Sequence, residues 1–284
     1  MPIILSMLFL SLCYSLDCNE AEEIELWGIC YNIETTTSIS LSGTPDGLTG
    51  GIPWEISLLV NLNYLNLSYN ELSGPIPPEI GELINLTTLY LHGNQLTGPI
   101  PSEIGGLENL TRLYLQHNQL TGFIPTEIGE LANLSWLYLG DNQLTGSIPE
   151  EIGELTNLRR FNLEYSQLSG AIPESLYNLS LSIFDIENNY FTGFLSDQIC
   201  DIPNLTIRNN EFCPPYPECV TTLRNITTYD GWDELKNVEF DFCYGDESIS
   251  DVLNGNTTIK LGDYYGDNAI YTPRVFVVEM STTW

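Results

Sequence analysis

A phrase of 24 residues is repeated almost unchanged through the middle of the chain. Residues 85 to 108 read NLTTLYLHGNQLTGPIPSEIGGLE, and the next two stretches of 24 residues, from Asn109 and Asn133, keep the same leucines, glycines and prolines. A unit this short cannot bury its apolar side chains alone, so consecutive units must stack against each other. The repetition therefore predicts a solenoid in which each unit forms one coil.

One asparagine marks the same position in successive units, and it lets the period be followed beyond the three best repeats. It is found at Asn70, Asn94, Asn118 and Asn142, and the equivalent positions further on are Ser166, Asn189 and Asn210. The spacing shortens from 24 to 23 and then 21 residues. Loss of regularity towards one end is typical of the coils that close an array.

The pattern LxxLxLxxNxLxGxIPxxIGxL resembles the leucine-rich repeat, in the plant-type version found in plant receptor ectodomains and polygalacturonase-inhibiting proteins. The resemblance covers about residues 18 to 219. It implies an α/β solenoid: a right-handed array with a parallel sheet on its concave side and short helical or 3-10 turns on its convex side. It does not identify a ligand, because one scaffold can host many functions.

Each coil supplies its own set of inward-pointing apolar residues. In the third clean coil these are predicted to be Leu110, Leu113, Leu115, Leu120, Ile124, Ile128 and Leu131. Each contributes about 1.5–3 kcal/mol when fully buried, and only if neighbouring coils cover it. The repeated asparagines are expected to bond the backbone of adjacent coils, which makes them structural residues rather than binding residues.

The chain divides into five segments. Residues 1–15, MPIILSMLFLSLCYS, form an apolar run that is too short to span a bilayer and ends in small residues, as in a signal peptide; a buried N-terminal strand is the alternative. We expect an N-terminal cap over 16–37, repeats over 38–212, a C-terminal cysteine cap over 213–243 and an acidic, β-rich segment over 244–284. The last segment ends abruptly, as a truncated larger protein would.

The cysteines lie at the two ends of the repeats and none lies within them. Apart from Cys13 they are Cys18, Cys30, Cys200, Cys213, Cys219 and Cys243. Their even number predicts disulfides that close the ends of the solenoid of an exported protein. The stretch from Trp27 to Cys30 resembles the end of plant-type N-terminal caps, although it is one residue shorter, and a Cys18–Cys30 bridge would be worth about 3 kcal/mol. The other pairings stay open.

Charge restricts the partners. Eight Lys and Arg residues stand against 38 Asp and Glu residues, for a net charge of −30. Such a surface repels phosphate backbones and anionic membrane surfaces, so we predict no nucleic-acid partner. After the first apolar run no segment could cross a membrane, so we also predict no membrane insertion of the mature chain. The acidic surface suits a secreted or cell-surface protein. The acidic loops 241–251 and 263–267 lack regular calcium-ligand spacing and no cofactor motif occurs, so we predict neither a metal nor a cofactor.

Three columns of residues are expected to line the concave face, because the strand leucines between them point inward. The position between the two strand leucines is Asn66, Tyr90, Tyr114, Tyr138 and Asn162. The column before it is Tyr64, Thr88, Arg112, Trp136 and Arg160, and the column after it is Ser68, His92, Gln116, Gly140 and Glu164. Neighbouring strands lie about 4.8 Å apart, so the three tyrosines should form a continuous strip.

Tyr, Trp, Arg and His on one surface are the composition of a recognition site. The predicted ligand-binding residues are Tyr64, Tyr90, Tyr114, Tyr138, Trp136, Arg112, Arg160, His92, His117 and Asp141. The alternative is that stacked tyrosines only stabilise the sheet. His117 and Asp141 fall side by side in the next column, where a carboxylate could orient an imidazole as a general base. No Ser or Cys nucleophile is in register, so we predict a hydrogen-bonded surface pair and no enzyme.

The first hypothesis is therefore an extracellular recognition module that binds a protein, peptide or glycan on its concave face. An adhesive or cell-envelope protein, in which the repeats act as a spacer, is the alternative. Resemblance to polygalacturonase inhibitors also implies an inhibitor of a secreted glycosidase. Eight sequons could accept N-glycans, several of them created by the repeat itself: Asn66, Asn85, Asn109, Asn133, Asn178, Asn204, Asn225 and Asn256.

Overall fold

The structure is a computed structural model, and it describes residues 18–19, 22–45, 47–213 and 216–222. All of them belong to the first of two compact units, Met1–Asp233 and Glu234–Trp284. The predicted signal peptide, Cys243 and the acidic segment over 244–284 lie outside the described residues. So does most of the predicted C-terminal cap.

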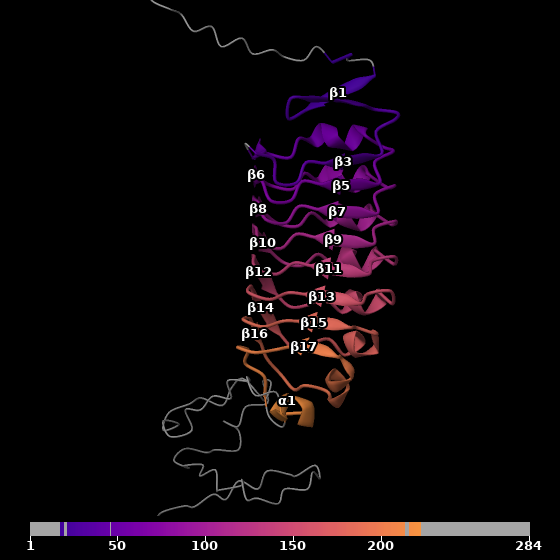
Figure 1. Cartoon of the computed structure of the whole chain (residues 1–284). Helices are drawn as coiled ribbons and strands as arrows, with labels where there is room; N and C mark the ends of the chain where they lie inside the picture. Colours follow the sequence, from indigo (N-terminus) through magenta and orange to yellow (C-terminus); the bar gives the residue numbers. More distant parts are fainter. Residues whose placement is uncertain (1–17, 20–21, 46, 214–215, 223–284) are drawn as a thin grey trace, which may run out of the picture. The chain divides into compact units, whose positions relative to one another are not determined.

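One short strand from each coil joins an eight-stranded parallel sheet, in which sequence neighbours are also spatial neighbours (Figure 1). Its strands are β3 (Ser38–Ser40), β5 (Tyr64–Asn66), β7 (Thr88–Tyr90), β9 (Arg112–Tyr114), β11 (Trp136–Tyr138), β13 (Arg160–Asn162), β15 (Ile183–Asp185) and β17 (Asn204–Thr206). Equivalent residues pair from coil to coil, as Leu113 pairs with Leu137. The predicted parallel sheet is thereby confirmed.

A second parallel sheet, of seven strands, runs beside the first and was not predicted from the repeat. Its strands are β4 (Thr49–Gly50), β6 (Glu71–Gly74), β8 (Gln95–Gly98), β10 (Gln119–Gly122), β12 (Gln143–Gly146), β14 (Gln167–Gly170) and β16 (Tyr190–Phe191). Most of these strands end at a glycine with positive φ, such as Gly146 at +77°. A side chain would strain this left-handed backbone, so the repeated glycine sets where the strand ends and the turn begins.

Short 3-10 helices form the remaining side of each coil, as predicted. They are η1 (Trp54–Leu58), η2 (Pro78–Glu82), η3 (Ser102–Gly106), η4 (Thr126–Glu130), η5 (Glu150–Glu154), η6 (Glu174–Asn178) and η7 (Asp197–Asp201). A proline precedes most of them and fixes φ at the entry, as Pro101 does at −67°. Successive helices approach closely: a Cβ on Gly105 would lie 2.7 Å from the backbone oxygen of Glu127. A Cβ at Gly105 would therefore force the two helices to shift.

The core is a continuous column of leucine and isoleucine between the two sheets and the helices. The seven apolar residues predicted to face inward in the coil that begins at Leu110 are all buried, with exposed fractions of 3% or less. Where the repeat diverges, Phe161 and Phe184 replace leucine and stack with their ring centroids 5.6 Å apart. The core is therefore built between coils rather than within them, as the solenoid prediction requires.

Buried and half-buried asparagines hold the coils together on the side of the two sheets. The Asn142 Nδ2 donates to the carbonyl oxygens of Leu115 (3.1 Å) and Leu139 (2.8 Å), while its Oδ1 accepts from the Leu120 amide (2.9 Å). Leu115 and Leu120 belong to the preceding coil, and Leu139 to the asparagine's own coil. Equivalent bonds are made by Asn70, Asn94, Asn118, Asn189 and Asn210. The predicted structural role of this ladder is confirmed.

A hairpin covers the N-terminal end of the array. It consists of β1 (Glu23–Leu26) and β2 (Ile29–Asn32), which pair antiparallel through a turn at Trp27 and Gly28. The predicted bridge between Cys18 and Cys30 is present, with the Cα atoms 5.6 Å apart. Leu26, only 1% exposed, joins the core of the first coils. The hairpin thereby shields apolar residues that the first coil would otherwise expose to water.

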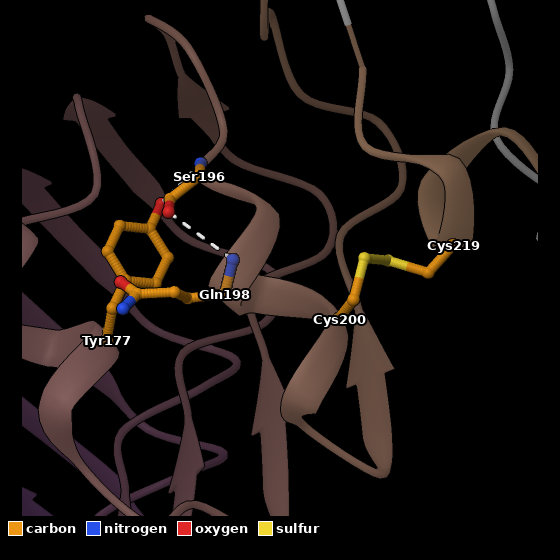
Figure 2. The surroundings of a disulfide bond; sticks show 5 residues. All are labelled: Tyr177, Ser196, Gln198, Cys200 and Cys219. Carbon is orange, nitrogen blue, oxygen red and sulfur yellow. Dashed lines mark hydrogen bonds between the residues drawn. A yellow bond between two sulfur atoms is a disulfide. The ribbon is translucent and has the colours of Figure 1, made fainter. Parts of the chain in front are cut away.

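A second disulfide closes the other end. Cys200 in η7 is bonded to Cys219 in the short helix α1 (Glu218–Thr222), as Figure 2 shows. The start of η7 is capped by Ser196, whose hydroxyl oxygen accepts from the Gln198 amide at 3.3 Å. Cys213, 0% exposed, is also disulfide-bonded. Both ends of the solenoid are thus stapled as the cysteine distribution predicts.

Candidate functional site

The outward side of the eight-stranded sheet carries the columns that the sequence predicts. Trp136 pairs with Arg112 on one side and with Arg160 on the other, while Tyr138 pairs with Tyr114. Leu137, between the two aromatic residues of β11, is fully buried. Because side chains alternate along a strand, Trp136 and Tyr138 project from the opposite side of the sheet, where they are partly exposed.

The aromatic rings of four consecutive strands form one continuous surface. We call it the aromatic face, and it consists of Tyr64, Tyr90, Tyr114, Trp136 and Tyr138. The ring centroids of Tyr90 and Tyr114 lie 4.6 Å apart, and those of Tyr114 and Tyr138 also lie 4.6 Å apart. Tyr64 extends the row through an edge contact with Tyr90 at 6.0 Å. The predicted tyrosine strip is thereby confirmed as a geometric feature.

Two arginines flank the tryptophan of this face. The Cζ atoms of Arg112 and Arg160 each lie 4.5 Å from the centroid of the Trp136 ring. The indole also stacks on Tyr114 with the ring planes 28° apart. A guanidinium over an aromatic ring is attracted to the π electrons and is held in a defined orientation. We call Arg112, Trp136 and Arg160 the arginine clamp.

Two phenols of the face, those of Tyr90 and Tyr114, have a raised pKa. Burial, together with the nearby Tyr138 and Tyr90 and against the opposing charges of Arg160 and Arg112, raises the pKa of Tyr114 to about 12. Burial likewise raises the pKa of Tyr90, although Arg112 lowers it by its charge and by a side-chain hydrogen bond. Neutral phenol groups can both donate and accept hydrogen bonds, which suits the polar groups of a ligand.

His92 lies beneath the aromatic face and is only 8% exposed. Its ring makes edge contacts with Tyr69, Tyr90 and Tyr114 at centroid distances of 4.8, 5.8 and 5.6 Å. Burial lowers the pKa of its imidazole, with a further contribution from His117. His92 is therefore a neutral support for the rings, and it offers a ligand far less surface than the other residues predicted with it.

Tyr69 was not among the predicted residues, although it is 63% exposed and packs on His92. It has a left-handed backbone with φ of +54°. The sequence does contain a signal for it, because Tyr69 occupies the same column as Gly93, His117 and Asp141. Extending that column by one coil would have added Tyr69 to the predicted surface.

His117 and Asp141 form the surface pair that the column register predicts. The Nδ1 atom of His117 lies 2.9 Å from the Oδ2 atom of Asp141, and their side chains are 55% and 35% exposed. This is the one ion pair found within the described part of the chain. Both side chains therefore lie on a solvated ridge beside the aromatic face.

The face changes charge towards the C-terminal coils, and sequence reasoning did not single out this region. Burial raises the pKa of Asp185, a hydrogen bond from the Glu187 backbone amide lowers it, and the charges of Glu164 and Glu187 raise it; the net pKa is about 6. The column of tyrosines continues through Asn162 to Asp185 by register pairing. Continuing the columns beyond the fifth coil would have revealed this cluster of carboxylates.

The structure offers no built metal site in its described residues. The one close group of potential ligands there is Cys18, Glu23 and Cys30, and its two sulfur atoms are joined in a disulfide. A disulfide cannot supply the thiolates that a metal such as zinc requires. Among the same residues, no helix has the length and apolar character needed to cross a membrane.

Solved structures of plant proteins resemble this chain. One is the leucine-rich repeat ectodomain of the receptor kinase GASSHO1/SCHENGEN3 from Arabidopsis thaliana, in complex with CASPARIAN STRIP INTEGRITY FACTOR 2. It is 38% identical in sequence to this chain with a TM-score of 0.59, and the match covers 62% of this chain and 21% of that chain. Another is the Arabidopsis receptor kinase HAESA, in complex with the peptide hormone IDA and the co-receptor SERK1. It is 32% identical with a TM-score of 0.55, and the match covers 58% of this chain and 28% of that chain. This chain therefore spans less than a third of either receptor.

A plant ice-binding protein is similar as well. It is 31% identical with a TM-score of 0.51, over 64% of this chain and 66% of that chain. A comparison with curated protein sequences finds no match.

The model of a protein family, described as leucine-rich repeat region, matches residues 53–227, which is more than half of the 284 residues. The matched residues include the whole aromatic face and both sheets from β6 onward, so this chain belongs to the leucine-rich repeat family.

Proposed function

We propose that this chain is an extracellular, non-enzymatic recognition module that binds a peptide on its aromatic face. The observation that carries the proposal is the unbroken row of rings from Tyr64 to Tyr138, together with the arginine clamp, on the solvent side of a rigid sheet. Preformed aromatic surfaces lose little conformational entropy on binding, and Tyr, Trp and Arg are the residues that dominate interface energies.

A purely structural role accounts for less of this arrangement. Cross-strand aromatic pairs contribute about 0.2–1 kcal/mol to a sheet. The fold already has a continuous leucine core and an asparagine ladder, and the terminal strands β3 and β17 carry Ser40 and Thr206 at the position of Tyr114. The aromatic residues gather in the central coils, where a ligand would contact several strands at once.

A peptide is the ligand class that the comparisons favour. The HAESA structure is described as a complex with a peptide hormone, and it shares 32% of its residues with this chain over the aligned part. An extended peptide has aromatic, apolar and charged groups at the spacing of a few ångströms that the face offers. A glycan, whose rings also stack on aromatic side chains, is a distinct outcome of the test.

The disulfides support an extracellular location. Cys18–Cys30 and Cys200–Cys219 both close the ends of the fold. Such bridges persist in oxidising compartments, so we place the protein outside the cytosol, secreted or on the cell surface. There the net charge of −30 also keeps the protein soluble.

A random peptide library displayed on phage, selected against the immobilised full-length chain, tests the proposal. We expect selected peptides to lose at least about 30-fold in affinity for the variant Tyr114→Ala/Trp136→Ala, because two central aromatic contacts are worth about 2 kcal/mol or more. The melting temperature should fall only slightly, since both side chains are partly exposed.

Phe123→Ala is the matched control. Phe123 is 70% exposed but follows β10 of the second sheet, so its loss should leave peptide binding unchanged. Selected peptides that bind the double variant as well as the natural chain would overturn the proposal. A glycan array that yields ligands dependent on Tyr114, when the peptide library yields none, would replace the peptide by a carbohydrate. If neither the peptide library nor the glycan array yields a ligand, the repeats would instead act as a spacer.

A further inference from the structure

The arginine clamp is built across three adjacent strands. Arg112 in β9 and Arg160 in β13 are the register partners of Trp136 in β11, one on each side. Each guanidinium carbon is 4.5 Å from the centroid of the indole ring. The indole therefore orients both guanidinium groups, and a guanidinium that rests on a ring can still bind an anion through its planar fork of N–H donors.

These arginines keep their charge unneutralised in a chain that is rich in carboxylates. There are 38 Asp and Glu residues against eight Lys and Arg residues. Within the described ranges the one ion pair nevertheless joins His117 to Asp141, and neither Arg112 nor Arg160 has a carboxylate partner there. Burial raises the pKa of the Tyr90 phenol and the charge of Arg112 opposes this, so the Arg112 guanidinium lies close to the aromatic face.

Arg159 makes different contacts from the two arginines of the clamp. It neighbours Arg160 in sequence but is exposed, and its Nη1 donates to the backbone oxygens of Thr156 (3.0 Å) and Leu158 (2.9 Å). Its donors are therefore partly satisfied by its own coil. Arg112 and Arg160 differ because their guanidinium groups lie on an aromatic ring of the predicted binding surface.

The coil of Arg160 and the coil that follows it carry carboxylates on the C-terminal side of the clamp. Glu164 and Glu187 each lie close enough to repel the carboxylate of Asp185. They follow Arg160 towards the C-terminal end of the array, whereas Tyr90 and Tyr64 precede Arg112 towards the N-terminal end. An anion on this surface is therefore attracted at the clamp and repelled immediately beyond it.

We propose that the clamp of Arg112, Trp136 and Arg160 binds an anionic group of the peptide ligand, with the rest of the peptide running over Tyr114 and Tyr90 towards the N-terminal coils. The inference rests on the proposed function and adds the chemistry and the direction of the ligand. Guanidinium donors match the oxygen atoms of a carboxylate or a sulfate ester, and stacking on Trp136 holds them ready before binding.

Small aromatic probes test this directly, whatever the natural ligand is. Phenylacetate supplies a carboxylate, phenyl sulfate supplies a sulfate ester, and phenylacetamide is the neutral control of similar shape. Each is titrated into the full-length chain while the arginine side-chain N–H and the indole N–H signals are followed by NMR. We expect at least one anion to bind about tenfold more tightly than the amide and to shift the signals of Arg112, Arg160 and Trp136.

The variants Arg112→Gln and Arg160→Gln, combined, should reduce the affinity of the anion to that of the amide, while Arg159→Gln should leave it unchanged. The preference between phenylacetate and phenyl sulfate tells which anionic group the clamp takes. Equal binding of the amide and both anions, or an anion affinity that survives in the combined variant, would overturn the inference. Peptides selected from the library that still depend on Tyr114 but carry no acidic group would reject the clamp and leave the recognition face intact.

Discussion

The imidazole Nδ1 of His117 lies 2.9 Å from the carboxylate Oδ2 of Asp141, although the two residues belong to different coils. They occupy equivalent positions of neighbouring repeats, and both have a left-handed backbone, with φ of +56° and +49°. The same column holds Gly93, for which this conformation carries no steric cost. The pair thus combines a favourable contact with an unfavourable backbone.

We expect His117→Gly to change the free energy of unfolding by less than about 1 kcal/mol. An exposed ion pair is worth about 0.2–1 kcal/mol, whereas a left-handed non-glycine residue costs roughly 1–2 kcal/mol, so the two effects oppose each other. Urea unfolding at pH 7 measures the difference. A loss of more than about 2 kcal/mol would show that His117 is needed to hold the coils together and is not merely an exposed surface contact.

The asparagine ladder gives a larger effect. Asn142→Ala should destabilise the chain by roughly 2–4 kcal/mol, because the backbone groups of Leu115, Leu120 and Leu139 would each lose a bond in a buried site. Asn157→Ala is the matched control, since Asn157 is exposed and donates only to the Ala132 oxygen, at 2.9 Å. Similar losses in the two variants would argue against a special role for the buried column.

Register explains how much of this molecule could be predicted from its sequence. A strict repeat places equivalent residues side by side, so the buried leucines, the row from Tyr90 to Tyr138 and the contact between His117 and Asp141 all follow from counting residues. Such a prediction does not depend on side-chain conformations. It works wherever the period is kept, so it is most complete for the central coils.

The features that were not predicted are those that do not follow from the register of the repeat. The strands of the second sheet are two to four residues long and lie in the NQLTG part of the repeat, where polar residues and glycine are typical of a loop. The burial of His92 depends on Tyr69, which covers it from the preceding coil. The carboxylate cluster around Asp185 lies where the period shortens, so its column was not followed.

Glycine in the 3-10 helices tests the closeness of neighbouring coils. Gly105→Ala should destabilise the chain by about 1–3 kcal/mol, because the added Cβ would meet the Glu127 oxygen at 2.7 Å and force backbone to move. Gly51→Ala is the control, since its nearest contact, the Ser73 oxygen at 3.7 Å, is an ordinary one. Thermal unfolding of both variants measures the difference. An unchanged midpoint for Gly105→Ala would mean that the coils can separate at no cost.

The carboxyl group of Asp185 predicts a dependence of stability on pH. Burial, with Glu164 and Glu187 nearby, raises its pKa from the ordinary 3.8 to about 6 in the folded chain. The folded state therefore binds the proton more tightly than the unfolded state. The resulting stabilisation is fully present below about pH 4 and is lost as the pH rises through 6.

Asp185→Asn removes this titration, so the stability of the variant relative to the natural chain should rise between pH 4 and pH 7. We expect a gain of about 1–2 kcal/mol, after allowance for partial solvent exposure. Urea midpoints at the two pH values measure it. Glu103→Gln, at an exposed carboxylate of η3, controls for the loss of one negative charge from a very acidic protein. A relative stability that stays constant, or falls, from pH 4 to pH 7 would show that the Asp185 carboxylate is solvated rather than crowded by its neighbours.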